Sequence, residues 1–102
     1  MQHILYIGLN DKDTKKQEIN TLDAYKIIQN ILLSSGYDGG SLTEATGFYK
    51  HESGEIVIEK SIRVELDFAE DKKTNDAIKQ IKQVLNQESV LLQTINSNNQ
   101  YI

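Results

Sequence analysis

The chain has 102 residues, of which 38% are hydrophobic and 25% are charged, as in a single small globular domain. Its formal net charge of −4 argues against general nucleic-acid binding, which normally depends on a basic surface. The absence of cysteine excludes disulfides, thiolate metal sites and cysteine nucleophiles, and two histidines are too few for a histidine-rich metal site. We therefore expect no bound metal and no other cofactor.

The N-terminal segment, MQHILYIGLN, has neither the basic start nor the cleavage site of an export signal. Its apolar run is also far shorter than a membrane span. We expect a cytoplasmic protein without membrane contact. Ten of the eleven basic residues are lysine, which is typical of AT-rich coding in a low-GC bacterium or its phages.

The first part of the chain predicts a strand and a helix. The strand covers residues 3–9 (HILYIGL), a compact apolar run, and a polar loop follows it. Thr21 is placed to cap the start of the helix and Gly36 to end it. Apolar residues recur between them every three or four positions and predict one core-facing stripe: Leu22, Tyr25, Ile28, Ile31 and Leu32.

A hairpin follows this helix. Residues 41–51 predict the second strand, and Gly54 predicts a tight turn because glycine accepts a positive φ without strain. The third strand alternates with a period of two residues. Its predicted core-facing row is Ile56, Ile58, Ile62, Val64, Leu66 and Phe68. Its opposite row is polar: Glu55, Glu59, Ser61, Arg63, Glu65 and Asp67.

The last part of the chain predicts a second helix and a fourth strand. Thr74 is a candidate N-cap for the helix, and Asn86 a plausible end. The predicted core-facing stripe of this helix is Ala77, Ile78, Ile81, Val84 and Leu85. The fourth strand covers residues 89–95 (SVLLQTI).

The element order β-α-β-β-α-β predicts a ferredoxin-like α+β domain over residues 1–102. Right-handed crossovers place both helices on one face of a four-stranded antiparallel sheet, with the first and third strands at its centre. The other face is uncovered in a monomer. We expect Glu59, Ser61 and Arg63 in the middle of that open face.

Four separated segments carry a shared pattern. They are Leu5-Tyr6-Ile7-Gly8, the run from Leu42 to Gly47, the hairpin residues Gly47-Phe48-Tyr49, Gly54, Ile56-Val57 and Glu59-Lys60-Ser61, and finally Gln87-Glu88-Ser89-Val90-Leu91. On these residues the chain resembles a family of small bacterial proteins, the domain of unknown function 3574 family. The hairpin signature of that family reads Gly-Gln-Trp, four residues, Gly, then Ile-Val and Glu-Lys/Arg-Ser, and its spacing is matched here without a gap.

The chain departs from this family in three respects. Phe48-Tyr49 stands in place of Gln-Trp, which keeps an aromatic ring and loses the amide. The loop before the second strand lacks the proline-rich sequence common in the family, and the export signal of many members is absent. The resemblance supports the fold and points to positions, but the family implies no reaction.

The predicted binding positions are Tyr6, Tyr49, Glu59, Ser61, Arg63, Gln87, Glu88 and Ser89. Glu59 and Ser61 share one face of a strand, and Gln87-Glu88-Ser89 precedes the last strand, so together they could bind a small polar ligand. The alternatives are structural: Glu59 pairs with Arg63 or caps a loop, and Glu88 and Ser89 bond the backbone. For Arg63, the only arginine, we favour an ion pair within the chain or with a partner over ligand binding.

Catalysis by a serine nucleophile is disfavoured because neither His3 nor His51 is expected near Ser61. We favour a non-enzymatic, homo-oligomeric binding module, with a dimer as the expected assembly, whose target is a small polar ligand or another protein. One alternative is a phage or mobile-element inhibitor of a host protein. The other is a small enzyme that uses a cleft on the open sheet face.

Overall fold

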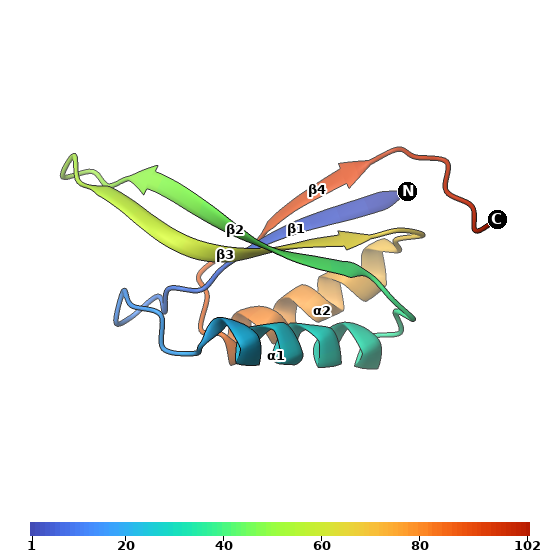
Figure 1. Cartoon of the computed structure of the whole chain (residues 1–102), viewed down its shortest axis with the longest axis horizontal. Coiled ribbons are helices and arrows are strands. Elements are labelled where there is room, and N and C mark those ends of the chain that lie inside the picture. The colour runs from blue at the N-terminus through green and yellow to red at the C-terminus, as the bar shows by residue number, and fades with distance from the viewer.

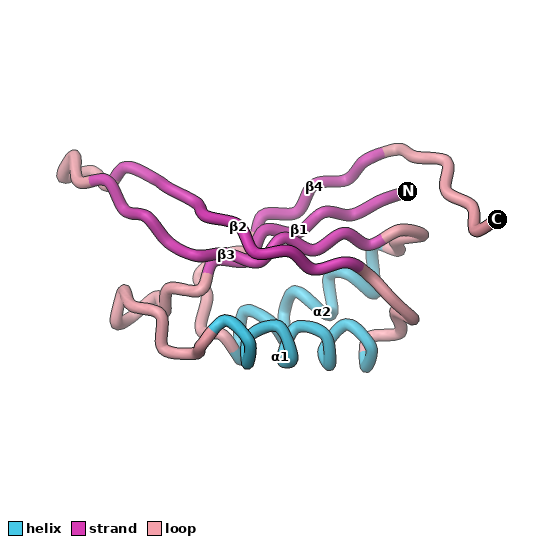
Figure 2. The backbone as a smooth tube through the Cα atoms, in the orientation of Figure 1, coloured by secondary structure: helices cyan, strands magenta, loops and turns pink.

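A computed structural model describes residues 1–102 and confirms the predicted element order. The elements are β1 (Gln2–Gly8), α1 (Thr21–Ser34), β2 (Ser41–Lys50), β3 (Ile56–Leu66), α2 (Asp71–Val84) and β4 (Leu91–Ile95). They form a single four-stranded antiparallel sheet with two helices beneath it (Figures 1 and 2). The ferredoxin-like architecture is therefore confirmed.

The strand order is β2-β3-β1-β4, so the first and third strands are central, as predicted. In the register, Leu5 lies opposite Val64 and Tyr6 opposite Arg63. Since side chains alternate between the faces of a strand, Leu5 and Val64 face the helices while Tyr6 and Arg63 face away. We call the side without helices the open face.

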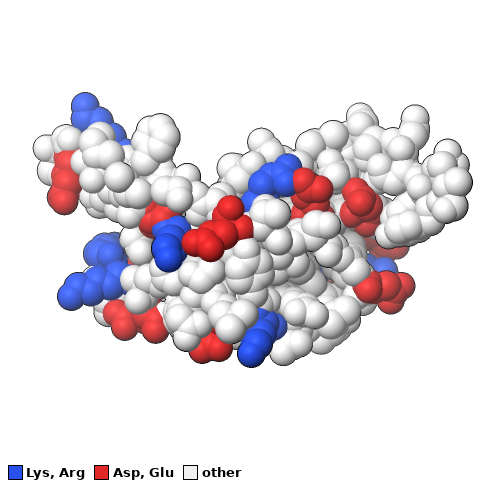
Figure 3. Space-filling model, in the orientation of Figure 1, with Lys and Arg blue, Asp and Glu red and all other residues white.

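The core lies between the sheet and the two helices. Fully buried apolar side chains come from both layers, including Leu5 and Ile62 from the sheet and Ile28 and Ile81 from the helices. Burying a side chain of this kind contributes about 1.5–3 kcal/mol, so this layer supplies most of the folding energy. Neither helix has the length and apolar character needed to cross a membrane. Lysines and acidic residues are interspersed on the face shown in Figure 3.

The start of α1 differs by one residue from the prediction. Asn20, not Thr21, is the N-cap, and its side-chain oxygen accepts a 2.9 Å hydrogen bond from the backbone N–H of Asp23. Leu22 was predicted to face the core but is 64% exposed, because the buried stripe of the helix begins at Ala24. At the other end Gly36 has a φ of 105°, as expected for a left-handed residue after a helix.

The prediction that Thr74 caps α2 is wrong. The N-cap is Glu70, and Thr74 lies inside the helix, fully buried. Its hydroxyl is 2.6 Å from His3 Nδ1 and 2.6 Å from the Tyr37 hydroxyl, which explains a polar residue in the core. Further along, Val84 is half-exposed rather than buried.

The β2–β3 hairpin extends beyond the rest of the sheet, as the upper left of Figure 1 shows. The partner of β3 on its other side is β1, and that pairing ends at Gly8 and Ser61. Ile56 and Ile58, predicted to be core residues, lie past this point and are 56% and 68% exposed. Ile56 and Ile58 lie in the predicted strand and alternate as expected, but no helix reaches far enough to cover them. Gly54 turns the hairpin with a φ of 91°.

The other end of β3 also differs from the prediction. The strand ends at Leu66, and Phe68 has a φ of 53°, in the left-handed region that a bulky residue rarely adopts. Phe68 is therefore half-exposed instead of buried, and its ring stacks on that of Tyr101. The fourth strand begins at Leu91, two residues later than expected.

Candidate functional site

A cavity of about 660 Å³ lies beside the open face, between the projecting hairpin, the loop after β1 and the turn before β4. We call it the open-face cavity. Seven of the eight predicted binding positions line it: Tyr6, Tyr49, Glu59, Ser61, Gln87, Glu88 and Ser89. They come from β1, the hairpin and the segment after α2, so the fold brings together residues that are far apart in sequence.

The side chain of Glu59 is held at the C-terminal end of β1. Its Oε2 accepts a hydrogen bond of 3.2 Å from the backbone N–H of Asn10, so one predicted alternative, the capping of a loop, is realised. The carboxylate also lies against Gly8, where an added Cβ would be 2.7 Å from Oε1. Glycine at this position therefore makes room for the carboxylate. Glu59 forms no ion pair, whereas its neighbour Lys60 lies 3.8 Å from Glu44.

Ser61 and Tyr6 lie further along the same face. The Ser61 hydroxyl is largely buried and donates to the carbonyl of Ala45 over 3.4 Å. The Tyr6 hydroxyl oxygen accepts a 3.1 Å hydrogen bond from Arg63 Nε. Because the arginine uses the oxygen as an acceptor, the phenolic proton of Tyr6 remains available to a ligand in the cavity.

Arg63 is the one predicted position that does not line the cavity. It binds Glu65 on its own strand, and its guanidinium carbon lies 5.9 Å from the centre of the Tyr6 ring. The hydrogen bond to Glu65, with a smaller contribution from Tyr6, raises the pKa of Arg63 above its ordinary value. For Arg63 the sequence favoured an ion pair, within the chain or with a partner, over ligand binding. The structure contains such a pair within the chain, between Arg63 and Glu65.

The Gln87-Glu88-Ser89 segment forms the opposite wall. The Gln87 amide donates to the Asn10 carbonyl over 2.7 Å and ties the loop after β1 to the turn before β4. Gln87 is nearly buried, so this bond is a fixed part of the wall. Glu88 and Ser89 are exposed, and their side chains make no hydrogen bond within the chain.

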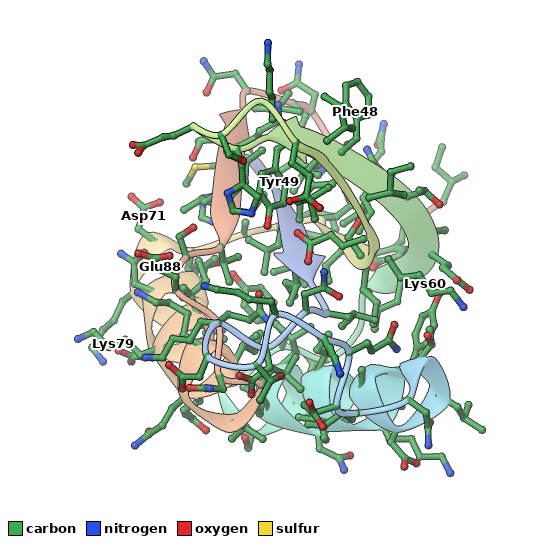
Figure 4. The ribbon with its side chains drawn as sticks, turned by 90° about the vertical axis from the view of Figure 1, so that its left-hand side faces the viewer. Phe48, Tyr49, Lys60, Asp71, Lys79 and Glu88 are labelled. Carbon is green, nitrogen blue, oxygen red and sulfur yellow. The ribbon has the colours of Figure 1, made fainter.

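The hairpin contributes aromatic side chains. Phe48 and Tyr49 both line the cavity; in Figure 4 Tyr49 lies beneath the hairpin with Glu88 across from it, and Phe48 lies at the outer side of the hairpin. The ring of His51, which also lines the cavity, meets the ring of Tyr49 edge-on with centroids 5.3 Å apart. The sequence interpretation set His51 aside because it is distant from Ser61 along the strands, and no hydrogen bond joins the two.

The polar loop predicted after the first strand supplies lining residues that were not among the predicted binding positions: Asn10, Asp11, Lys12 and Lys15. Hydrogen bonds from the Asn86 side chain, and then from the backbone N–H groups of Thr14 and Asp13, lower the pKa of Asp11 below its ordinary value. Asp11 is therefore a fixed anion at the rim. No local spacing in the loop predicted this position, because it depends on Asn86 and Gln87, which are more than seventy residues away.

The cavity thus combines an unpaired carboxylate, tyrosine rings and hydroxyls, and a rim that carries both signs of charge. A carboxylate beside aromatic faces suits a ligand with a positively charged or hydrogen-bond-donating group. No group of three or more histidine, aspartate or glutamate side chains is placed to hold a metal ion.

A search of curated protein sequences gave no significant match. Among solved structures, the chain is similar to a phage SAM lyase in complex with S-methyl-5'-thioadenosine, with 23% identity, a TM-score of 0.68, and 89% of this chain and 76% of that chain covered. It is also similar to the periplasmic divalent cation tolerance protein CutA from Archaeoglobus fulgidus, with 14% identity, a TM-score of 0.62, and coverage of 99% and 88%. A third similar structure is CutA1 from Pyrococcus horikoshii, with 18% identity, a TM-score of 0.59, and coverage of 95% and 86%.

These identities are low, so the similar structures establish the shared fold alone. The sequence itself is more specific, because the resemblance noted along both strands of the hairpin extends over the domain. Residues 2–101 match the family described as "Protein of unknown function (DUF3574)", and the chain belongs to that family.

Proposed function

We propose that this protein is a homo-oligomeric binding module whose open-face cavity holds a small polar ligand through Glu59. The observation that supports it is the position of Glu59: a carboxylate without an ion-pair partner, fixed by Asn10 and Gly8, in a cavity that is also lined by Tyr6 and Tyr49. A cavity of about 660 Å³ is within the usual size range for a drug-sized or nucleoside-sized molecule.

The chemistry of the lining narrows the ligand class. Glu59 can accept hydrogen bonds from an ammonium or guanidinium group and can attract a sulfonium group through its charge, and a tyrosine face attracts a cation within about 6 Å. Tyr6 offers a proton that Arg63 leaves free, so an acceptor on the same ligand can be bound nearby. The ligand we propose therefore carries a positive group and a hydrogen-bond acceptor on a small organic frame.

Calorimetric titration with S-adenosylmethionine, S-methyl-5'-thioadenosine and a panel of small amines tests this proposal. We expect at least one cationic compound to bind, and Glu59→Gln to weaken it by roughly 10- to 100-fold because a charged acceptor is lost. Glu55→Gln is the matched control, since Glu55 is on the same hairpin but outside the cavity. Absence of any binder that depends on Glu59 would contradict the proposal.

A second candidate is a small enzyme that uses the same cavity. It is favoured by the fold likeness to a SAM lyase in complex with S-methyl-5'-thioadenosine, together with an unpaired carboxylate and two tyrosines in the open-face cavity of this chain. The test is incubation with S-adenosylmethionine followed by chromatography. Formation of S-methyl-5'-thioadenosine that disappears in Glu59→Gln supports the enzyme, and binding without turnover leaves the binding module.

A further inference from the structure

The projecting hairpin has a second face, most of which lies outside the open-face cavity; of its residues only Phe48 also lines the cavity. Phe48, Ile56 and Ile58 lie on it with 80%, 56% and 68% of their surfaces exposed, and Phe48 pairs directly with Ile58 across the two strands. We call these three residues the hairpin strip. Ile56 and Ile58 do not line the cavity, so the hairpin strip adjoins the cavity at Phe48 and extends away from it.

The exposure of the strip is unusual for its sequence. Ile56 and Ile58 continue, interrupted only by Lys60, the apolar row that is fully buried from Ile62 to Leu66. Between Ser61 and the turn of the hairpin, β2 and β3 pair only with each other, and no third strand or helix lies against them. A two-stranded ribbon is marginally stable alone in water, and an apolar row on its surface is typical of a face that another molecule covers.

The opposite end of the molecule offers a surface of matching character. There Phe68 and Tyr101 stack with ring centroids 5.4 Å apart and are 49% and 89% exposed. Beside them Asp67 accepts hydrogen bonds from the side chains of Gln2 and Asn99 but forms no ion pair. We call Asp67, Phe68 and Tyr101 the tail patch.

Charge distinguishes the two surfaces. Lys50 lies opposite Ile56 at the end of the hairpin strip and, like Asp67, forms no ion pair within the chain. The hairpin strip is therefore apolar with an unpaired lysine, and the tail patch is apolar with an unpaired carboxylate. A contact between them would bury aromatic and isoleucine side chains and pair the two charges.

One chain cannot make this contact with itself. The two surfaces lie at opposite ends of β3, whose eleven residues span about 35 Å at roughly 3.3 Å per residue. We infer that the hairpin strip of one protomer docks on the tail patch of a second copy of this chain. Each contact joins the head of one copy to the tail of another, and it is either made twice by the same two copies about a two-fold axis or continued by further copies into a ring.

This inference deepens the oligomeric part of the proposed function and is tested by light scattering after size exclusion. For the natural chain we expect the mass of two or more chains of 11.6 kDa, and for Ile58→Lys we expect the mass of a single chain. Leu22→Lys is the control, because Leu22 is 64% exposed but lies on α1, outside both surfaces. A monomeric natural chain, or an Ile58→Lys variant that keeps the full assembly mass, would overturn the inference.

A charge exchange tests the identity of the docked surface. Lys50→Glu and Asp67→Lys should each weaken assembly by about 10-fold or more in the dissociation constant, and the double variant should recover most of the loss. Circular dichroism checks that each variant is folded. Assembly that is insensitive to Asp67→Lys, or a double variant no better than the single ones, would overturn the head-to-tail contact.

The two proposals remain separable. Neither Ile58 nor Asp67 lines the open-face cavity, so ligand titration can be run on the same variants. A monomeric natural chain that still binds a cationic ligand through Glu59 would reject the head-to-tail assembly and keep the ligand site.

Discussion

Glu59 shows how much of a side chain's role depends on its neighbours. A glutamate at this position of an alternating strand faces the open side in any antiparallel sheet. Its particular place, against Gly8 and under the backbone N–H of Asn10, exists because β1 ends there and the chain turns across the end of the sheet. The carboxylate is held in one orientation without a cation, which leaves its charge for a ligand.

The contact with Gly8 leads to a prediction at the residue scale. Gly8→Ala places a methyl group 2.7 Å from Glu59 Oε1, so the carboxylate must move. Because the carboxylate is the free end of a flexible side chain, it can turn aside at little cost, so we expect little change in the free energy of unfolding, measured by urea denaturation, but a loss of ligand binding similar to that of Glu59→Gln.

Gly39→Ala is the control for this substitution, because nothing lies within 4 Å of a Cβ at that position. The double variant Gly8→Ala/Glu59→Gln should bind ligand no more weakly than Glu59→Gln alone, since both changes act on the same carboxylate. If Gly8→Ala binds ligand normally, the role assigned to Gly8 is wrong.

At the scale of elements, α2 is attached to the sheet by a buried polar chain as well as by apolar packing. The backbone N–H of Glu70 donates to the Tyr37 hydroxyl over 3.0 Å, and this hydroxyl lies 3.3 Å from the Glu70 carbonyl and 2.6 Å from the Thr74 hydroxyl. The Thr74 hydroxyl also lies 2.6 Å from His3 Nδ1, and His3 Nε2 lies 3.2 Å from the Asp71 carboxylate. This chain joins β1, the α1–β2 turn and the first turns of α2.

Thr74→Val tests this attachment. Valine has nearly the same shape but leaves His3 and Tyr37 without their shared partner, so we expect a loss of about 1–3 kcal/mol in the free energy of unfolding. Thr74→Ser keeps the hydroxyl and should lose clearly less. Equal stability of the valine variant and the natural chain in urea denaturation would show that the polar chain contributes nothing net.

At the scale of the whole molecule, exposed apolar side chains cluster at the two ends of β3. The interior between sheet and helices is closed, while both ends of the long β3 strand leave apolar side chains in solvent: Ile56, Ile58, Phe68 and their neighbours Phe48 and Tyr101. The principal extents of 48 × 24 × 22 Å reflect the projecting hairpin and the tail at opposite ends. Such a shape places surplus apolar surface where copies of the chain can meet.

Assembly of this kind predicts a thermal midpoint that rises with protein concentration, because the associated state is favoured by mass action over the unfolded chain. Scanning calorimetry over a hundredfold range of concentration measures it. Ile58→Lys should show a lower midpoint that does not change with concentration. A concentration-independent midpoint in the natural chain would contradict the coupling of folding to assembly.

The sequence interpretation succeeded where structure follows from local periodicity. The alternation along β3 and the spacing of Ile28, Ile31 and Leu32 in α1 are properties of neighbouring residues, and they predicted the element order and the fold. The hairpin signature identified the family for the same reason, since its spacing is preserved along one strand pair. The sequence predicted the ends of the helices less accurately: Asn20 and Glu70 are the N-caps, not Thr21 and Thr74.

Local pattern by itself thus determined which residues alternate and which face of each strand is polar, because side-chain direction is fixed by backbone geometry. Only the tertiary structure decided what covers each face. Ile58 and Ile62 follow the same pattern, yet one is exposed and the other fully buried, because β1 and the helices end between them. Likewise the loop at Asn10 forms a wall of the cavity because Gln87 binds it, a contact between residues that no spacing along the chain connects.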